Sequence, residues 1–256
     1  QAGAVVFQHP DVGYADPARN FAIEQARYDW ILVIDADEEV PASLAATLTS
    51  LVRETTASVI WLPRQNYIFG ELANYGGWWP DYQPRLFRKG HVQWLVGVHR
   101  MPEIIGQEHY LPARPECALL HHNYTSVSHF IEKLNRYTTI QAREREATHE
   151  TPTTGADVVT VFRNELLRRL FADKGITGGA HGVGLSFLQS LYELTIALKM
   201  WEQHKGEVRP YHDQEGTLQA LDQLTRDLRY WIADTKIEHT TGLKKLYWQI
   251  RKRLRI

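Results

Sequence analysis

The clearest pattern in the sequence is an apolar run at residues 30–34 that ends abruptly in acid. An unbroken run of this kind, rich in β-branched and aromatic residues, is typical of a strand buried on both faces of a parallel sheet. Residues 4–7 predict a shorter strand, and Asp16 followed by Pro17 predicts a helix that extends to about Tyr28. Strand, helix and strand together predict one βαβ unit with a right-handed crossover.

Strand and helix patterns alternate to about residue 125, and helical periodicity follows from Ser126 onward. A helix is predicted from Pro41, and residues 89–90 predict a turn that pairs two strands as a hairpin. The further predicted strands are 57–62, 82–88, 91–96 and 116–120, and the later helices are 126–150, 158–171, 185–201, 221–232 and 243–256. The pattern therefore predicts an α/β domain over residues 1–125 and a helical C-terminal region over residues 126–256.

The acids after the apolar run are candidates for ligand chemistry. Side chains at i and i+2 of an extended chain point the same way, so Asp35 and Asp37 can aim two carboxylates at one point beyond the strand end. Open α/β sheets bind ligands at such places, and paired carboxylates suit a hard divalent cation that takes up diphosphate oxygens. The alternative is a polar strand end followed by helix-capping acids.

Composition narrows the function classes. The chain has 256 residues and a net charge of −1, which argues against general nucleic-acid binding. Its one cysteine, Cys117, excludes an internal disulfide and fits a reducing compartment. The most apolar later stretch, residues 183–201, is broken by Gln189, Glu193 and Lys199, so we expect no transmembrane span.

Several ordered segments resemble glycosyltransferase family 2, and in particular the bacterial branch that builds lipopolysaccharide core and other envelope glycans. The resemblance is good over residues 1–145 and looser to Glu202. The matching segments are residues 19–26 (RNFAIEQA), 29–38 (DWILVIDADE), 85–88 (RLFR), 97–99 (GVH), 121–124 (HHNY) and 133–138 (KLNRYT). The resemblance implies a GT-A (Rossmann-like) mixed sheet and inverting transfer of a sugar from a nucleotide-sugar donor to an envelope glycan or lipid-linked acceptor.

The resemblance also implies roles for single residues. Asp35 and Asp37 would hold Mn²⁺ or Mg²⁺, with His121 or His122 as a further ligand, since imidazole suits manganese. Which histidine faces the site is left open, because adjacent strand residues face opposite ways. Arg19 would lie near the donor together with Asp35; the alternative is a plain surface arginine.

The acceptor side is less defined. Trp78 and Trp79 in a glycine-rich loop, together with His99, are candidates for acceptor binding, although tryptophans also fill core edges. Much of the family reads V-H-E where this chain has Arg100 after His99, so the general base is unassigned between Glu103 and Asp81.

Two rival functions follow from these departures. The lost glutamate keeps open a degenerate, non-catalytic homologue that binds glycan. A phosphotransferase of the haloacid dehalogenase type also ends a strand in D-x-D, but it needs a hydroxyl residue soon afterwards, which residues 38–41 do not supply.

The C-terminal helix predicts a membrane contact. Residues 243–256 place apolar side chains at helical spacing among six cations and no acid, as in a helix that lies on an anionic membrane. We therefore expect a peripheral location on the cytoplasmic face of the cell membrane. A solvated tail, or a helix packed on its own domain, is the alternative.

The resemblance further implies a chain without its N-terminal nucleotide-binding portion. In the family the acidic strand follows a half that opens with a strand and a P-T-x-N-E-like loop, and residues 1–29 contain no such loop. We therefore expect a truncated sheet with residues 30–34 at or near an exposed edge. Such a chain should bind nucleotide sugars weakly or not at all.

Overall fold

The computed structural model describes residues 3–10, 15–95, 101–146, 152, 154–204 and 214–255. The chain divides into two compact units, which we describe separately. Unit 1 comprises Gln1–Asn74 and Trp78–Phe130, and unit 2 comprises Tyr75–Gly77 and Ile131–Ile256.

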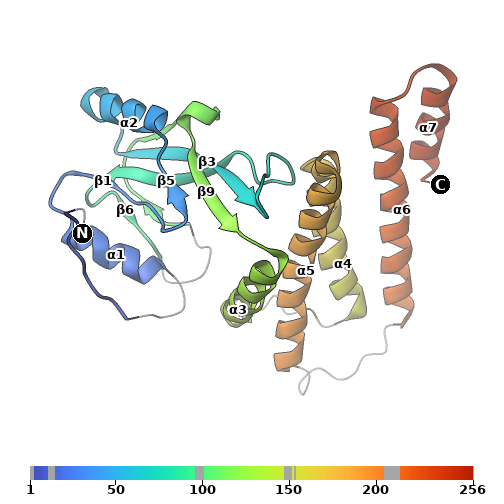
Figure 1. Cartoon of the computed structure of the whole chain (residues 1–256). Helices are drawn as coiled ribbons and strands as arrows, with labels where there is room; N and C mark the ends of the chain where they lie inside the picture. The colour runs from blue at the N-terminus through green and yellow to red at the C-terminus, as the bar shows by residue number, and fades with distance from the viewer. Residues whose placement is uncertain are drawn as a thin grey trace. The chain divides into compact units, whose positions relative to one another are not determined.

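Unit 1 is a mixed sheet with a helix on each face (Figure 1). Its helices are α1 (Asp16–Gln25) and α2 (Ala42–Glu54), with a 3₁₀ turn at Pro115–Cys117. Its strands are β1 (Trp30–Leu32), β2 (Glu38–Glu39), β3 (Val59–Ile68), β4 (Glu71–Leu72), β5 (Asp81–Arg88), β6 (Val92–Gln93), β7 (Glu103–Ile104), β8 (Glu108–Tyr110) and β9 (Leu119–Tyr124). The main sheet runs β1-β5-β3-β9-β2, with β4 and β8 also paired to β3, and β6 pairs with β7 in a separate two-stranded sheet.

The core of unit 1 follows from strand alternation along β3. Ile60 and Leu62 face a cluster that includes Leu44 and Leu48 of α2. Val59 and Trp61 face the opposite cluster, which includes Ile23 of α1. Because successive strand residues point to opposite faces, one strand supplies both cores and fixes a helix on each side.

Unit 2 is helical. Its helices are α4 (Gly155–Leu167), α5 (Gly179–His204), α6 (Gln214–Glu238), α7 (Gly242–Leu254) and the larger part of α3 (Val127–Glu146), with a π-helical turn at Arg168–Ala172 and a 3₁₀ turn at Gly175–Gly178. Thr154 and Asp157 cap α4 reciprocally through a capping box. Leu166, Leu170 and Phe171 pack against Trp231 of α6. In the described part of the chain, no helix is both long and apolar enough to cross a membrane.

The predicted fold class, an α/β sheet followed by a helical C-terminal region, is confirmed. Three local predictions are wrong. Residues 4–7 form no strand and their apolar side chains are exposed, so the predicted βαβ unit is absent. The strand at residues 92–93 pairs with β7 rather than with β5. The last strand begins at Leu119, so His121 and His122 lie inside β9 instead of following it.

The apolar run at residues 30–34 is less buried than its composition predicts. β1 covers only its first three residues and pairs antiparallel with β5 at one end of the sheet order. Leu32 and Ile34 are 39% and 38% exposed. The expectation that this run lies at a sheet edge is therefore confirmed for the described residues. The prediction that it is buried on both faces of a parallel sheet is wrong.

We predict that Leu62→Ala destabilises unit 1 by about 2–5 kcal/mol, because the fully buried side chain leaves a cavity beneath α2. Urea unfolding followed by tryptophan fluorescence measures the change. Ile105→Ala is the control, since Ile105 is 64% exposed and its truncation should cost less than about 0.5 kcal/mol. Equal effects of the two changes would contradict the assignment of the core.

Candidate functional site

Arg19 of α1 and Asp35 after β1 form the first pair of the site. Nη2 of Arg19 donates to Oδ1 and Oδ2 of Asp35 at 2.7 and 2.6 Å, and Nη1 also pairs with Asp16. Nη2 of Arg85, from β5, donates to Asp35 Oδ2 at 2.5 Å. Both carboxylate oxygens of Asp35 are therefore held by arginines.

The pairing continues across the sheet through Glu38, whose side chain is fully buried. Its Oε1 accepts from Arg85 Nη2 at 2.6 Å and from Arg64 Nη1 at 2.9 Å, and Oε2 accepts from the Asp35 amide. Arg64 also donates to Asp81 Oδ2, at 2.6 Å from Nη2. We call Asp16, Arg19, Asp35, Arg85, Glu38, Arg64 and Asp81 the charge network; the signs of its members alternate from one end to the other.

The charge network fixes protonation states. Burial by itself would raise the pKa of Asp35, but the charges and hydrogen bonds of Arg85 and Arg19 outweigh it and lower that pKa to about 2. Burial likewise opposes ionisation of Asp81, and Arg64 with Asn66 and Gln83 reverses this, so the pKa of Asp81 is also lowered. Both carboxyl groups are anions at neutral pH.

Asp37 has a different partner. Its side chain is 39% exposed, and Oδ2 lies 3.6 Å from Nε2 of His121, while its backbone carbonyl accepts from the His122 amide. His121 is buried on β9. His122 points to the other side of the strand, is exposed, and stacks on Tyr67. The sequence left open which of the two histidines faces Asp37, and in the structure this histidine is His121.

Asn66 of β3 orients this histidine. Its Nδ2 donates to the Trp78 carbonyl at 2.9 Å and to Asp81 Oδ2 at 3.1 Å, and both partners are acceptors. Asn66 Oδ1 is then the group that faces His121 Nδ1, at 2.6 Å, so Nδ1 must carry the proton. In the neutral form of this ring, the lone pair of Nε2 is directed toward the Asp37 carboxylate.

This donor set fits a divalent cation with two protein ligands. Two lone-pair atoms that face each other at 3.6 Å need a proton or a cation between them. Among the described residues no group of three or more metal-ligating side chains occurs. Manganese and magnesium sites of nucleotide enzymes often have one or two protein ligands and are completed by water and phosphate. Asp37 and His121 fit that pattern, whereas Asp35 already binds two arginines.

The other predicted residues are spread more widely. Asp81 joins the site through Asn66 and Arg64. Glu103 is exposed in the two-stranded sheet, opposite Gln93. Trp78 and Trp79 are half-buried, and the ring of Trp78 lies edge-on to Tyr124. His99 and the neighbouring Arg100 lie outside the described residues.

Sequence reasoning missed Arg64, Asn66, Arg85 and Glu38 as members of the site. A signal was present in β3, where Ile60 and Leu62 are followed by Arg64 and Asn66 at the same two-residue spacing. Side chains two residues apart lie on the same face of a strand, so this face changes from apolar to polar where the strand leaves the core. A change of this kind indicates a candidate functional site.

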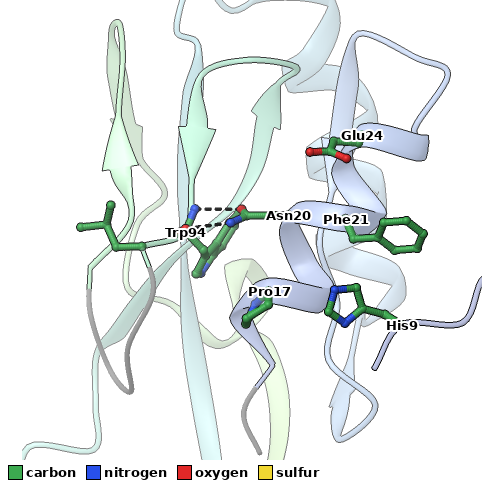
Figure 2. Close-up of a pocket in the computed structure, with 7 residues that line it drawn as sticks. His9, Pro17, Asn20, Phe21, Glu24 and Trp94 are labelled. Carbon is green, nitrogen blue, oxygen red and sulfur yellow. Dashed lines mark hydrogen bonds between the residues drawn. The ribbon is translucent and has the colours of Figure 1, made fainter. Parts of the chain in front are cut away.

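A separate pocket of about 340 Å³ opens beside α1 (Figure 2). It is lined by His9, Pro17, Asn20, Phe21, Glu24, Trp94 and Leu95. Asn20 forms one wall by binding the backbone of Trp94 twice, from Nδ2 to the carbonyl at 2.7 Å and from the amide to Oδ1 at 3.0 Å. The Arg19 guanidinium lies 5.9 Å from the centre of the Trp94 ring, so the same helix serves the pocket and the charge network.

Comparison with known proteins agrees with this fold. The model of Glycosyl transferase family 2 matches residues 4–101, which include both the charge network and Asp37. This part of the chain is therefore similar to glycosyl transferase family 2, and unit 1 has a GT-A-like α/β fold. A curated relative from Rhizobium meliloti (strain 1021), named lipopolysaccharide core biosynthesis glycosyltransferase LpsC, is 26% identical over 219 residues. The match covers 78% of this chain and 74% of the relative.

Acid should weaken unit 1 through Asp35. Because folding lowers the pKa of this carboxyl from 3.8 to about 2, its contribution is complete above pH 3.8 and is lost as the pH falls through 2. The contribution is about 2 kcal/mol of unfolding free energy. In Asp35→Asn, which cannot titrate, urea unfolding in the presence of a chelator should show a shallower decline over this pH range. Equal slopes for variant and wild type would contradict the pairing.

Proposed function

We propose that this protein transfers a sugar from a nucleotide-sugar donor to an envelope glycan or lipid-linked acceptor, with inversion and with Mn²⁺ or Mg²⁺. The family match and the relative named for lipopolysaccharide core biosynthesis support this class of reaction. The observation that carries the proposal is the 3.6 Å approach of Asp37 Oδ2 to Nε2 of the Asn66-oriented His121.

In this proposal Asp37 and His121 hold the divalent cation. The bound cation would neutralise charge on the departing diphosphate. Asn66 keeps the Nε2 lone pair directed at the site, and the Trp78 carbonyl and Asp81 fix the amide of Asn66. Such supporting hydrogen bonds commonly determine the affinity of a metal site.

Asp35 has a different task from Asp37. Asp35 binds Arg19 and Arg85 rather than the cation. Of these two arginines, Arg19 is the one that belongs to helix α1. A guanidinium held in place presents planar donors to phosphate oxygens. Arg19 therefore binds donor phosphate, and Asp35 sets its position.

An inverting transfer needs a carboxylate that takes the proton of the acceptor hydroxyl. Asp81 is engaged by Arg64, Asn66 and Gln83. Glu103 is exposed and forms no ion pair with the charge network in the described ranges. Glu103 is therefore the better candidate base, and Asp81 is a positioning residue. Trp78, Trp79 and His99 remain the candidates for contact with the acceptor.

A second candidate function is glycan binding without catalysis. The arginine pairs on Asp35 favour it, because they neutralise one of the two acids of the D-x-D pair with arginines in place of a cation. A panel of nucleotide sugars separates the two functions. Metal-dependent hydrolysis or transfer supports the enzyme, and glycan binding without turnover supports the binding protein.

The location proposed for either function is peripheral, on the cytoplasmic face of the cell membrane. A donor made from nucleotides and a lipid-linked acceptor would meet there. The single cysteine fits a reducing compartment.

We predict that Asp37→Asn abolishes metal-dependent turnover of the nucleotide sugar while leaving the circular dichroism spectrum unchanged. The reason is that the half-exposed carboxylate lies toward His121 and outside the two core clusters. Glu39→Gln is the matched control, since Glu39 belongs to the same acidic run but faces solvent beside Leu120. Wild-type turnover by Asp37→Asn with added metal would overturn the assignment.

We predict that Asn66→Leu weakens Mn²⁺ binding about 10–100-fold, because the imidazole loses the acceptor that sets its tautomer. Electron paramagnetic resonance of Mn²⁺ with a nucleoside diphosphate measures the affinity without requiring turnover. Gln65→Leu is the control, since the neighbouring strand position faces the opposite side of the sheet. If both variants bind Mn²⁺ like the wild type, Asn66 does not position the ligand.

A further inference from the structure

Helix α7 turns its apolar side outward. One stripe is formed by side chains that recur at the helical spacing i, i+3, i+4, i+7 and i+11: Leu243, Leu246, Tyr247, Ile250 and Leu254. Their exposed fractions are 86%, 53%, 53%, 51% and 58%. Within α7 no residue is buried. An amphipathic helix that simply packs on its own domain would bury this stripe, so the arrangement is the reverse of the usual one.

The opposite side of α7 holds it to α6 (Figure 1). Lys252 Nζ lies 2.6 Å from Asp234 Oδ1, and Nη1 of Arg255, just after the helix, lies 3.1 Å from Asp227 Oδ1. Both cations also lie over the ring of Tyr230, at 4.7 and 5.6 Å from its centre. Contacts between charged and aromatic groups therefore dock the helix and leave the apolar stripe pointing away from α6.

Further cations flank the stripe. At 100° per residue, Lys244 and Arg251 lie along one border and Arg253 along the other. The segment from Gly242 to the end of the sequence contains six cations and no acid, in a chain whose net charge is −1. Tyr247, within the stripe, adds an aromatic side chain of the kind enriched at membrane–water interfaces.

This combination selects one class of partner. A second copy of α7 could cover the apolar stripe, but it would bring its own flanking cations against these. A polyanion such as RNA would satisfy the cations but would leave the stripe in water. An anionic lipid surface satisfies both at once, because acyl chains cover the stripe and headgroups meet the cations. The helix has 13 residues, too few to span a bilayer, and suits the interface.

We propose that α7 is an interfacial helix that docks unit 2 on an anionic lipid surface, with the stripe in the acyl boundary and Lys244, Arg251 and Arg253 at the headgroups. The inference rests on the proposed function in one respect only: the proposed function identifies which cellular membrane supplies the anionic surface. It names the surface that makes the contact, and it is tested without donor or acceptor, so loss of catalysis would leave it standing.

Vesicle flotation with the full chain tests the proposal, using phosphatidylcholine vesicles with and without phosphatidylglycerol. We expect binding to the anionic vesicles to fall at least about tenfold in the double variant Leu246→Gln, Ile250→Gln, which removes apolar contact. In Lys244→Gln, Arg253→Gln, binding should fall about 25-fold, since each surface-proximal cation contributes roughly fivefold. Binding to neutral vesicles should be weak for all proteins.

Matched controls lie in unit 1. Ile105→Gln changes an apolar side chain that is 64% exposed, and Arg27→Gln, Arg53→Gln removes two exposed cations; both should bind anionic vesicles like the wild type. Circular dichroism confirms that α7 is retained in each variant. Unchanged vesicle binding in both α7 variants overturns the proposal. Loss of a dimer in sedimentation without loss of vesicle binding overturns it in favour of a second copy, and binding to RNA but not to vesicles overturns it in favour of a polyanion.

Discussion

The burial of Arg85 between Asp35 and Glu38 is the constraint on which the site depends. Arg85 is 2% exposed, and an arginine cannot give up its proton to escape the cost of burial. Its two acidic partners, Asp35 and Glu38, lie in the segment that follows β1 and leads into β2, whereas Arg64 and Asp81 lie on the middle strands β3 and β5. Each of these ions is acceptable inside the fold because the next one has the opposite sign. Removal of one would leave its neighbours buried and unpaired.

The charge network explains why the two aspartates of the D-x-D pair differ. Asp35 lies inside the network and is neutralised by arginine on both oxygens. Asp37 lies two residues further on, held through its backbone to β9 and half exposed beside His121. Alternation along an extended chain would give the two side chains one direction, but the short turn between β1 and β2 gives them different environments. A rigid ionic framework therefore stands next to an acid that is half exposed and lies beside His121.

The sequence predicted the class of fold, and it singled out the two aspartates and the late histidine as candidates, because each has a local signal. An apolar run that ends in acid, a period-two strand and a family motif can all be read from neighbouring residues. The network was not predictable in this way, since Arg19, Arg85 and Arg64 lie on three elements and meet only through the pairing of β1, β5 and β3. The tautomer of His121 likewise depends on Asn66, which is opposite it only because β3 and β9 run parallel in one register.

Two apolar segments are more exposed than simple burial of hydrophobic side chains would make them. The apolar run at residues 30–34 was expected to lie inside the sheet, and α7, where it packs on its own unit, would be expected to turn its apolar side inward. In β1, hydrogen bonding on one side alone leaves Leu32 and Ile34 half exposed, and Arg88 covers Trp30 at 4.8 Å from the ring centre. In α7, Lys252 and Arg255 reach acids and an aromatic ring on α6 and so determine which side faces the protein. Hydrophobic periodicity shows which side chains share a face, whereas ionic and cation–π contacts decide here where that face is directed. In α7 these contacts are part of the fold, and they direct the apolar stripe outward. An exposed apolar surface of this kind indicates a binding partner that covers it.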